Sequence, residues 1–149
     1  MKKYLLIILA CLLVGCEKAP KNGYLDGMWQ LTCIEEFAAD GTGASTFHYR
    51  KDRFWNFQLS LMQLGGRLYF SHFKRDGGSL TIERLARQSK NETATDNDDW
   101  LTEKDTTDIA AIREYGFFSL PPTTFAVEQI DDDAMVLRSG EARLTFRKY

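Results

Sequence analysis

The sequence predicts an all-β fold, with about eight antiparallel strands in one domain and one short helix. Apolar and polar residues alternate strictly at residues 55–61, which is typical of a strand with one face in water. Short glycine or acidic turns recur at residues 65–66, 76–78, 131–133 and 139–141. Such turns connect antiparallel neighbours, so the sheet is expected to close on itself or to pack against itself.

The first 15 residues are expected to be a cleavable signal peptide. Lys2 and Lys3 precede an uncharged apolar run at residues 4–14, which is too short to span about 30 Å of hydrocarbon. The letters LVGC at residues 13–16 resemble a lipobox, which implies that the sulfur of Cys16 carries a diacylglyceryl group. A secretory signal with an incidental cysteine is the alternative. We expect lipid chains, rather than a spanning helix, to hold the protein at a membrane.

A polar tether, residues 16–24, is expected to join the lipid to the folded domain, residues 25–149. The tether contains Pro20 and Gly23 and has little apolar area to bury. No acidic run beside Cys16 resembles a surface-export signal. We therefore expect the protein in the cell envelope, at the periplasmic face of the outer membrane.

Removal of the signal leaves 134 residues, enough for one domain, with 17 basic and 21 acidic side chains. Binding to nucleic acid needs a clustered basic face, which this composition does not offer. Cys11 leaves with the signal and Cys16 is acylated, so Cys33 remains alone and forms no intramolecular disulfide. Burial of its thiol is expected in preference to pairing between chains.

The strands follow in chain order, with one interruption. They are expected at residues 28–34, 46–49, 55–61, 67–73, 79–83, 124–128, 135–137 and 143–147. The interruption begins with residues 90–99, which contain no apolar residue larger than alanine and are expected to be a solvated loop. Asp105 is then expected to cap a helix over residues 106–115, which Gly116 ends.

The start of the first strand resembles the glycine-x-tryptophan motif of lipocalins and related barrels. Gly27 would let the chain turn sharply, and the indole of Trp29 would plug the closed end of the barrel. The resemblance implies an up-and-down barrel in which an arginine of the last strand packs over that indole through a cation–π contact. Arg147 is the matching candidate, and Arg143 is the alternative.

The whole chain is also similar to small lipocalin-like lipoproteins of Bacteroidetes. The shared features are the signal, the glycine-x-tryptophan strand, the helix before Gly116 and the closing hairpin at residues 135–148. The acidic loop at residues 96–99 departs from that pattern. The resemblance implies a fold and a location but no chemistry.

No cofactor, metal or catalytic residue is expected. His48 and His72, the only histidines, lie at no zinc-ligand spacing, and no serine occupies a nucleophile elbow. The acidic run at residues 96–99 lacks the glycine and the distal glutamate of an EF-hand. The sequence at residues 105–107 resembles an O-glycosylation sequon of Bacteroidetes, which makes Thr106 a candidate for modification; a helix cap is the alternative, and both can hold.

The alternation places a set of apolar side chains inside the barrel, beside Leu144. These candidate ligand-binding residues are Leu31, Trp55, Phe57, Leu59, Phe125 and Val127. An eight-stranded lumen can be filled by side chains or can hold one small ligand, and the same pattern serves both. The leading hypothesis is a non-enzymatic protein that binds a small apolar ligand. The alternative is a filled barrel that acts as a protein-interaction or inhibitor module of the envelope.

Overall fold

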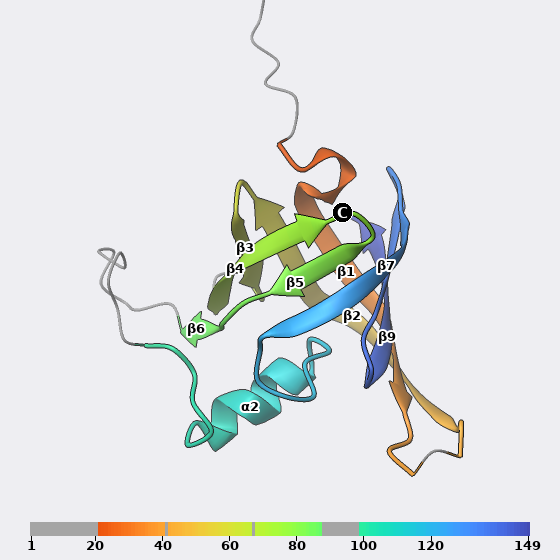
Figure 1. The fold of residues 1–149 in the computed structure, drawn as a ribbon, viewed down its shortest axis with the longest axis vertical. Coiled ribbons are helices and arrows are strands. Elements are labelled where there is room, and N and C mark those ends of the chain that lie inside the picture. The colour runs from red at the N-terminus through yellow and green to blue at the C-terminus, as the bar shows by residue number, and fades with distance from the viewer. Residues whose placement is uncertain (1–20, 41, 67, 88–98) are drawn as a thin grey trace, which may run out of the picture.

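The computed structural model describes residues 21–40, 42–66, 68–87 and 99–149. Within them, nine strands form one antiparallel sheet in the order β3-β2-β1-β9-β8-β7-β5-β4-β6, and β3 also pairs with β4. That pairing closes eight strands into a barrel, while β6 is a short strand beside β4 (Figure 1). The predicted antiparallel barrel of about eight strands with a short helix is confirmed.

The elements follow the chain with short connections. They are the 3₁₀ helix η1 (Gly23–Leu25), β1 (Gly27–Phe37), β2 (Ser45–Gln58), β3 (Leu61–Leu64), β4 (Tyr69–Asp76), β5 (Ser79–Ile82), β6 (Ala86–Arg87), α2 (Thr106–Arg113), β7 (Thr123–Ile130), β8 (Ala134–Arg138) and β9 (Ala142–Lys148). The strand predicted at residues 46–49 and the start of the one predicted at 55–61 are a single long strand, β2.

The interior position predicted for Leu59 is wrong. Gln58 pairs with Leu61, so Leu59 and Ser60 form a two-residue turn between β2 and β3. Leu59 has a positive φ of 58° and is 60% exposed. The physical reason is that the chain reverses there, and the inward face of β3 is then carried by Met62, which is fully buried.

The two ends of the barrel differ. At one end lie η1 and the C-terminus, and at the opposite end lie α2 and the connection from β1 to β2 (Figure 1). Trp29 belongs to the first end, because its indole N–H donates to the carbonyl of Leu25 in η1. We call the first the closed end and the second the helix end. Apolar side chains of the strands fill the space between them, and Leu25 of η1 and Ile112 of α2 belong to the same buried core.

The helix α2 begins after Asp105 as predicted but ends at Arg113 rather than at residue 115. The side chain of Asp105 makes no capping hydrogen bond to the helix. Instead it accepts hydrogen bonds from the backbone N–H and the hydroxyl of Thr102, at 2.7 and 2.8 Å. Gly116 has a φ of +95°, which L side chains rarely adopt, and it turns the chain away from the helix.

Several sequence predictions concern residues outside the described ones: the signal at residues 1–15, the acylated Cys16 and most of the acidic run at residues 96–99. The tether is described from Lys21 onward. There the Asn22 amide donates to the Leu59 carbonyl at 2.8 Å, so the folded part begins slightly before the predicted residue 25. Among the described residues, no helix has the length and hydropathy to span a bilayer.

Cys33 is only partly buried, whereas burial was expected. It lies on β1 beside a register shift between Leu31 and Cys33, where the regular alternation of faces is interrupted. Removal from water raises the pKa of its thiol, and the negative charge of Glu35 adds to that effect.

Candidate functional site

The lumen of the barrel is occupied by side chains. Trp55 lies stacked against Phe117 with ring centres 5.0 Å apart, and it meets Phe146 and Phe125 edge-on at 5.2 and 5.8 Å. The indole N–H of Trp55 donates to the Tyr115 carbonyl at 3.1 Å, so its polar edge is satisfied. These rings fill the position that a ligand would occupy in an open barrel.

The other candidate ligand-binding residues belong to the same packed interior. Leu31 and Phe57 are buried, and Val127 is partly buried against the core. Phe57 meets Phe73 edge-on at 5.1 Å. The predicted set, apart from Leu59, therefore faces inward, where its members contact other apolar side chains.

Phe117 was missed by the sequence interpretation, although it is the residue stacked on Trp55. It follows Gly116 in the irregular segment between α2 and β7, where no alternation marks the inward side. The only available signal was the neighbouring glycine. A Cβ at that glycine would lie 2.6 Å from Cδ2 of Leu144, so the backbone approaches the core closely there.

At the closed end, the cation over Trp29 is Lys148 and not an arginine. The Lys148 ammonium lies 4.2 Å from the centre of the Trp29 ring. Arg147 is exposed and its Nε donates to the side-chain oxygen of Gln30 on the outer wall. Arg143 forms an ion pair with Glu128 at 2.6 Å. Both arginine candidates are wrong because they lie on the outward face of β9.

Gly27 supports this arrangement. Its φ is +111°, and a Cβ there would lie 3.3 Å from Cε and Nζ of Lys148. The glycine therefore supplies both the turn expected from the motif and the room for the lysine side chain.

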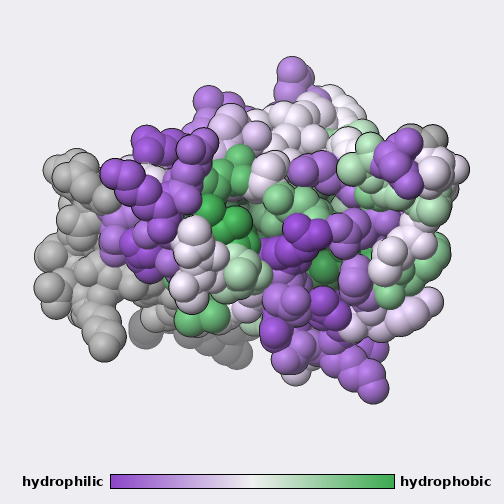
Figure 2. Space-filling model, turned by 90° about the horizontal axis from the view of Figure 1, so that it is seen from below, coloured by the Kyte–Doolittle hydropathy of each residue, from purple (hydrophilic) through white to green (hydrophobic). Residues whose placement is uncertain are grey.

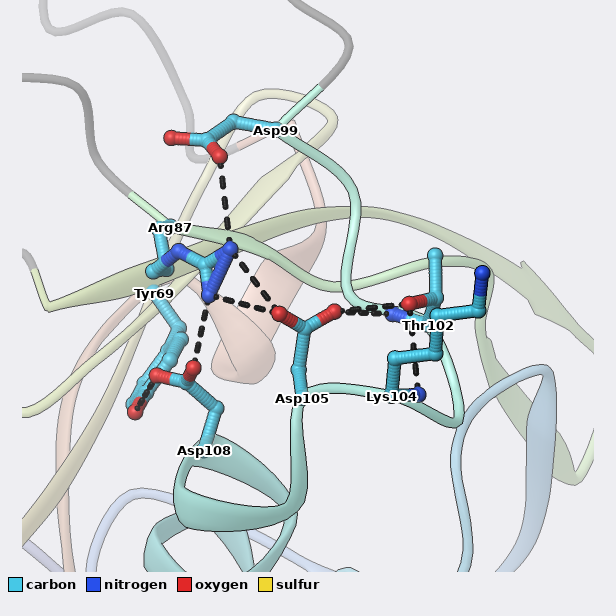
Figure 3. A network of polar contacts seen from close by, with 7 residues as sticks. All are labelled: Tyr69, Arg87, Asp99, Thr102, Lys104, Asp105 and Asp108. Carbon is cyan, nitrogen blue, oxygen red and sulfur yellow. Dashed lines mark hydrogen bonds and ion pairs between the residues drawn. The ribbon is translucent and has the colours of Figure 1, made fainter.

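Near the helix end, a polar network joins β6, β4 and α2 (Figure 3). The guanidinium of Arg87 contacts carboxylates of Asp108 at 2.6 Å, Asp105 at 3.1 Å and Asp99 at 3.4 Å. The hydroxyl of Tyr69 donates to the second oxygen of Asp108 at 2.7 Å. We call these five residues the Arg87 network.

The network shifts the ionisation of its members. Burial raises the pKa of Tyr69 to about 12, and the hydrogen bond to Asp108 adds to that effect. For Asp108, burial acts to raise the pKa, but the hydrogen bonds from Arg87 and Tyr69 outweigh it, and the pKa lies below its ordinary value. The pKa of Asp105 is lowered by its hydrogen bonds from Thr102 and by Arg87. The carboxylates of Asp105 and Asp108 are thus ionised and compensated at neutral pH.

The role of the Arg87 network is structural, because it links β4 and β6 to α2. In the described ranges, no group of histidine, cysteine, aspartate and glutamate side chains could hold a metal ion. Thr106 lies next to the network, exposed in the first turn of α2, so its hydroxyl is open to solvent. Its O-glycosylation stays a prediction.

The histidines lie apart from each other. His72 is exposed on β4, whereas His48 of β2 faces the helix end, with Nε2 3.1 Å from a carboxylate oxygen of Glu36. The second oxygen of Glu36 accepts from Arg113 of α2. A small pocket of about 100 Å³ lies between these side chains, and another of about 280 Å³ lies beside Phe37.

The first part of β2 is an exposed edge. Residues 45–49 pair with β1, whereas β3 pairs only with residues 55–58. Within the described part of the chain, no strand covers the other side of residues 45–49. Phe47 and Tyr49 project from the outer face and are 55% and 77% exposed. We call residues 45–49 the open edge.

Comparison with known proteins gives the following matches. The model of a family described as lipocalin-like domain matches residues 11–149. A lipocalin-like protein from Bacteroides uniformis ATCC 8492 superposes with a TM-score of 0.55 at 22% identity, over 85% of this chain and 100% of that chain. An uncharacterized protein from Bacteroides eggerthii DSM 20697 gives 0.54 at 21% identity, over 84% and 99%. At these identities the likeness shows the fold alone. The search of curated proteins gives no match.

Proposed function

We propose, from the premise that this chain belongs to the family of lipocalin-like domains, that it is a non-enzymatic, lipid-anchored binding module of the bacterial envelope. The partner is an extended segment of another protein, which adds as a strand to the open edge. The observation that carries this proposal is the unpaired side of residues 45–49 in a barrel whose lumen is filled.

An unpaired strand edge presents backbone N–H and C=O groups that another chain can satisfy. Proteins commonly shield such edges with charge, proline or a covering loop. Here the outer face of the edge instead carries two exposed aromatic side chains, Phe47 and Tyr49. An added strand would find backbone partners along the edge, and apolar side chains at alternate positions would contact these rings.

The position of the open edge suits an anchored protein. The described chain begins at the closed end, and the open edge lies toward the helix end (Figure 1). A lipid on Cys16 would hold the closed end near the bilayer, so the helix end would face away from it. Seen from the helix end, the surface is mainly hydrophilic, with hydrophobic residues exposed between the polar ones (Figure 2).

A small apolar ligand in the lumen is the second candidate function, favoured by the aromatic lining and by the family's fold. It would require the ring of Phe117 to leave its stacked position on Trp55. The filled interior gives this candidate less support than the open edge gives to strand addition.

Site-specific photo-crosslinking in cells of the native host tests the proposal. A photoreactive phenylalanine analogue at Phe47 or Tyr49 is expected to give one discrete adduct, which maps by mass spectrometry to an extended segment of one protein. The matched control is Thr145 of β9, whose strand is paired on both sides. Absence of an adduct from both edge positions, with saturable uptake of an apolar fluorescent probe by the purified protein, would replace strand addition by the lumen-binding function.

Anchoring is tested separately. Cys16→Ser is expected to leave the protein without a diacylglyceryl group, because serine cannot form the thioether. Mass spectrometry of the variant and fractionation of cell membranes are the measurements. A diacylglyceryl adduct on the variant would contradict the assignment.

A further inference from the structure

A basic pocket opens on the outer wall of the barrel, between β2, β1 and β9. Its volume is about 660 Å³, within the range of small-molecule sites. The side chains that line it are Gln30, Thr32, Tyr49, Arg50, Lys51 and Arg147. We call it the side pocket.

An irregularity of the sheet creates the side pocket. Leu31 pairs with Arg53 and Cys33 pairs with Tyr49, so three residues of β2 lie opposite the single residue Thr32 of β1. The extra residues bend the strand away from the ladder, as β-bulges do. Bulges are common beside binding sites because they redirect side chains.

Gln30 holds the floor of the side pocket in place. Its side chain belongs to a residue that is only 6% exposed, and its amide donates to the Lys51 carbonyl. Its oxygen accepts from Nε of Arg147. The buried amide therefore fixes the bulge on one side and the guanidinium on the other, before any ligand is present.

Two of the three cations that line the side pocket have no ion-pair partner among the residues that the structure describes. Among the described residues, no carboxylate lies within 4.0 Å of the charged groups of Lys51 or Arg147, whereas Arg50 pairs with Glu114 at 3.0 Å. Within the described part of the chain, Arg147 bonds to Gln30 through Nε and its two terminal nitrogens make no hydrogen bond, so they remain for a ligand. A guanidinium and an ammonium on one pocket favour a phosphate or carboxylate group.

Tyr49 supplies an apolar surface at the side pocket. Its ring is 77% exposed at the border of the side pocket and offers an apolar face beside the two cations. We infer that the side pocket binds an anionic sugar, whose phosphate or carboxylate lies between Lys51 and Arg147 and whose ring packs on Tyr49. This site goes beyond the proposed strand addition and does not depend on it.

Calorimetric titration of the purified protein in detergent at low ionic strength tests the inference. Glucose 6-phosphate and glucuronate are expected to bind saturably at one site, and glucose is expected not to bind. Arg147→Gln and Lys51→Gln should each weaken binding about tenfold or more, because each removes a charged donor. The matched control is Arg143→Gln, on the same face of β9 but paired with Glu128. The affinity of the Arg143→Gln variant for the anionic sugars should differ from that of the wild type by less than about twofold.

Titration with inorganic phosphate, which has no sugar ring, tests the contribution of the cations separately from that of Tyr49. Tyr49→Ser should weaken glucose 6-phosphate but leave phosphate binding unchanged. Thermal unfolding checks that the variants fold, and Lys51→Gln is the safer one because Gln30 bonds only to its backbone carbonyl. The inference is overturned if neither anionic sugar saturates at millimolar concentration, if Arg143→Gln weakens binding as much as Arg147→Gln, or if Tyr49→Ser weakens both probes equally. Crosslinking at Phe47 does not depend on Lys51 or Arg147. Strand addition at the open edge and sugar binding in the side pocket can therefore fail independently of each other.

Discussion

Lys148 joins the last strand to the first by placing its ammonium 4.2 Å from the centre of the Trp29 ring. The same Nζ donates to the Tyr24 carbonyl at 2.8 Å, and the Trp29 indole donates to the Leu25 carbonyl at 2.9 Å. Its charge is partly removed from water, and this burial lowers the pKa of Lys148. The contact therefore ties β9 to β1 and to η1 at the closed end.

Lys148→Met is expected to lower the free energy of unfolding by about 1 to 3 kcal/mol, because it removes the cation–π contact and hydrogen bonds to backbone carbonyls. Urea unfolding measures this loss. In a double-mutant cycle with Trp29→Leu, which removes the aromatic ring, Lys148→Met should show a coupling above about 0.5 kcal/mol, whereas Arg147→Met should not. Additive losses for Lys148 and Trp29 would contradict the contact.

The sequence contained enough to place Lys148. Leu144 and Phe146 are buried on β9, so the residue two positions further along faces inward as well, and Arg147 faces outward. The resemblance to lipocalins favoured an arginine, and that preference overrode the alternation. The strand pattern was the better guide because it is set by the geometry of the backbone.

The turn at Leu59 could not be found in the same way. Leu59 is not a typical turn residue, and although Ser60 is one, it also fits the polar positions of the period of two, which continues to Leu61. Only the pairing of β2 with β3, decided by which apolar residues the barrel can bury, shows where the strand ends. The alternation therefore predicted Trp55 and Phe57 correctly and failed at the next position.

The Arg87 network and the side pocket depend on contacts between distant segments. Arg87 meets carboxylates 18 and 21 residues further along the chain, and Gln30 meets Arg147 across 117 residues. Each of these residues looks like an ordinary surface residue in the sequence. Without the register of the strands, no spacing rule brings them together.

Gly116→Ala is expected to destabilise the domain by about 1 to 3 kcal/mol. The φ of +95° strains any L side chain, and the new Cβ would lie 2.6 Å from Cδ2 of Leu144. Thermal unfolding is the measurement. Gly140→Ala is the control, since its φ is not positive and no atom lies within 4 Å of the added Cβ. Equal stability of the Gly116 variant and the wild type would mean that the segment can shift to accept a methyl group.

Phe117→Ala is expected to lower stability by about 3 to 5 kcal/mol and to open a cavity beside Trp55. Uptake of an apolar fluorescent probe should then appear in the variant but not in the wild type. Phe47→Ala, at a side chain that is 55% exposed, should change neither quantity. Saturable uptake by the wild type that the Phe117 variant loses would instead identify the lumen as a natural ligand site.

Asp108→Asn is expected to destabilise the protein at neutral pH and to make little difference in acid. The pKa of Asp108 and that of Asp105 lie below their ordinary value in the folded state. The stability they contribute is therefore present above about pH 4, the value in the unfolded chain, and is lost as the pH falls through the folded-state pKa. Melting temperatures from pH 7 down to pH 2 should converge for wild type and variant. Glu103→Gln, at an exposed side chain nearby, is the control, and its melting temperature should change with pH in parallel with that of the wild type.

Tyr69→Phe is expected to change how stability depends on alkaline pH. The pKa of Tyr69 is raised to about 12 by burial and by the hydrogen bond to Asp108, whereas an unfolded tyrosine ionises near pH 10. Because the raised pKa disfavours tyrosinate in the folded state, stability is fully present below about pH 10 and falls as the pH rises toward 12. Urea unfolding at several pH values from 8 to about 11.5 should therefore show that the free energy of unfolding falls more steeply for the wild type than for the variant. At neutral pH the variant also lacks the hydrogen bond to Asp108. Tyr24→Phe, at an exposed tyrosine, should follow the wild type. Parallel curves for the wild type and the Tyr69 variant would show that the hydroxyl of Tyr69 is open to water and that the Arg87 network does not enclose it.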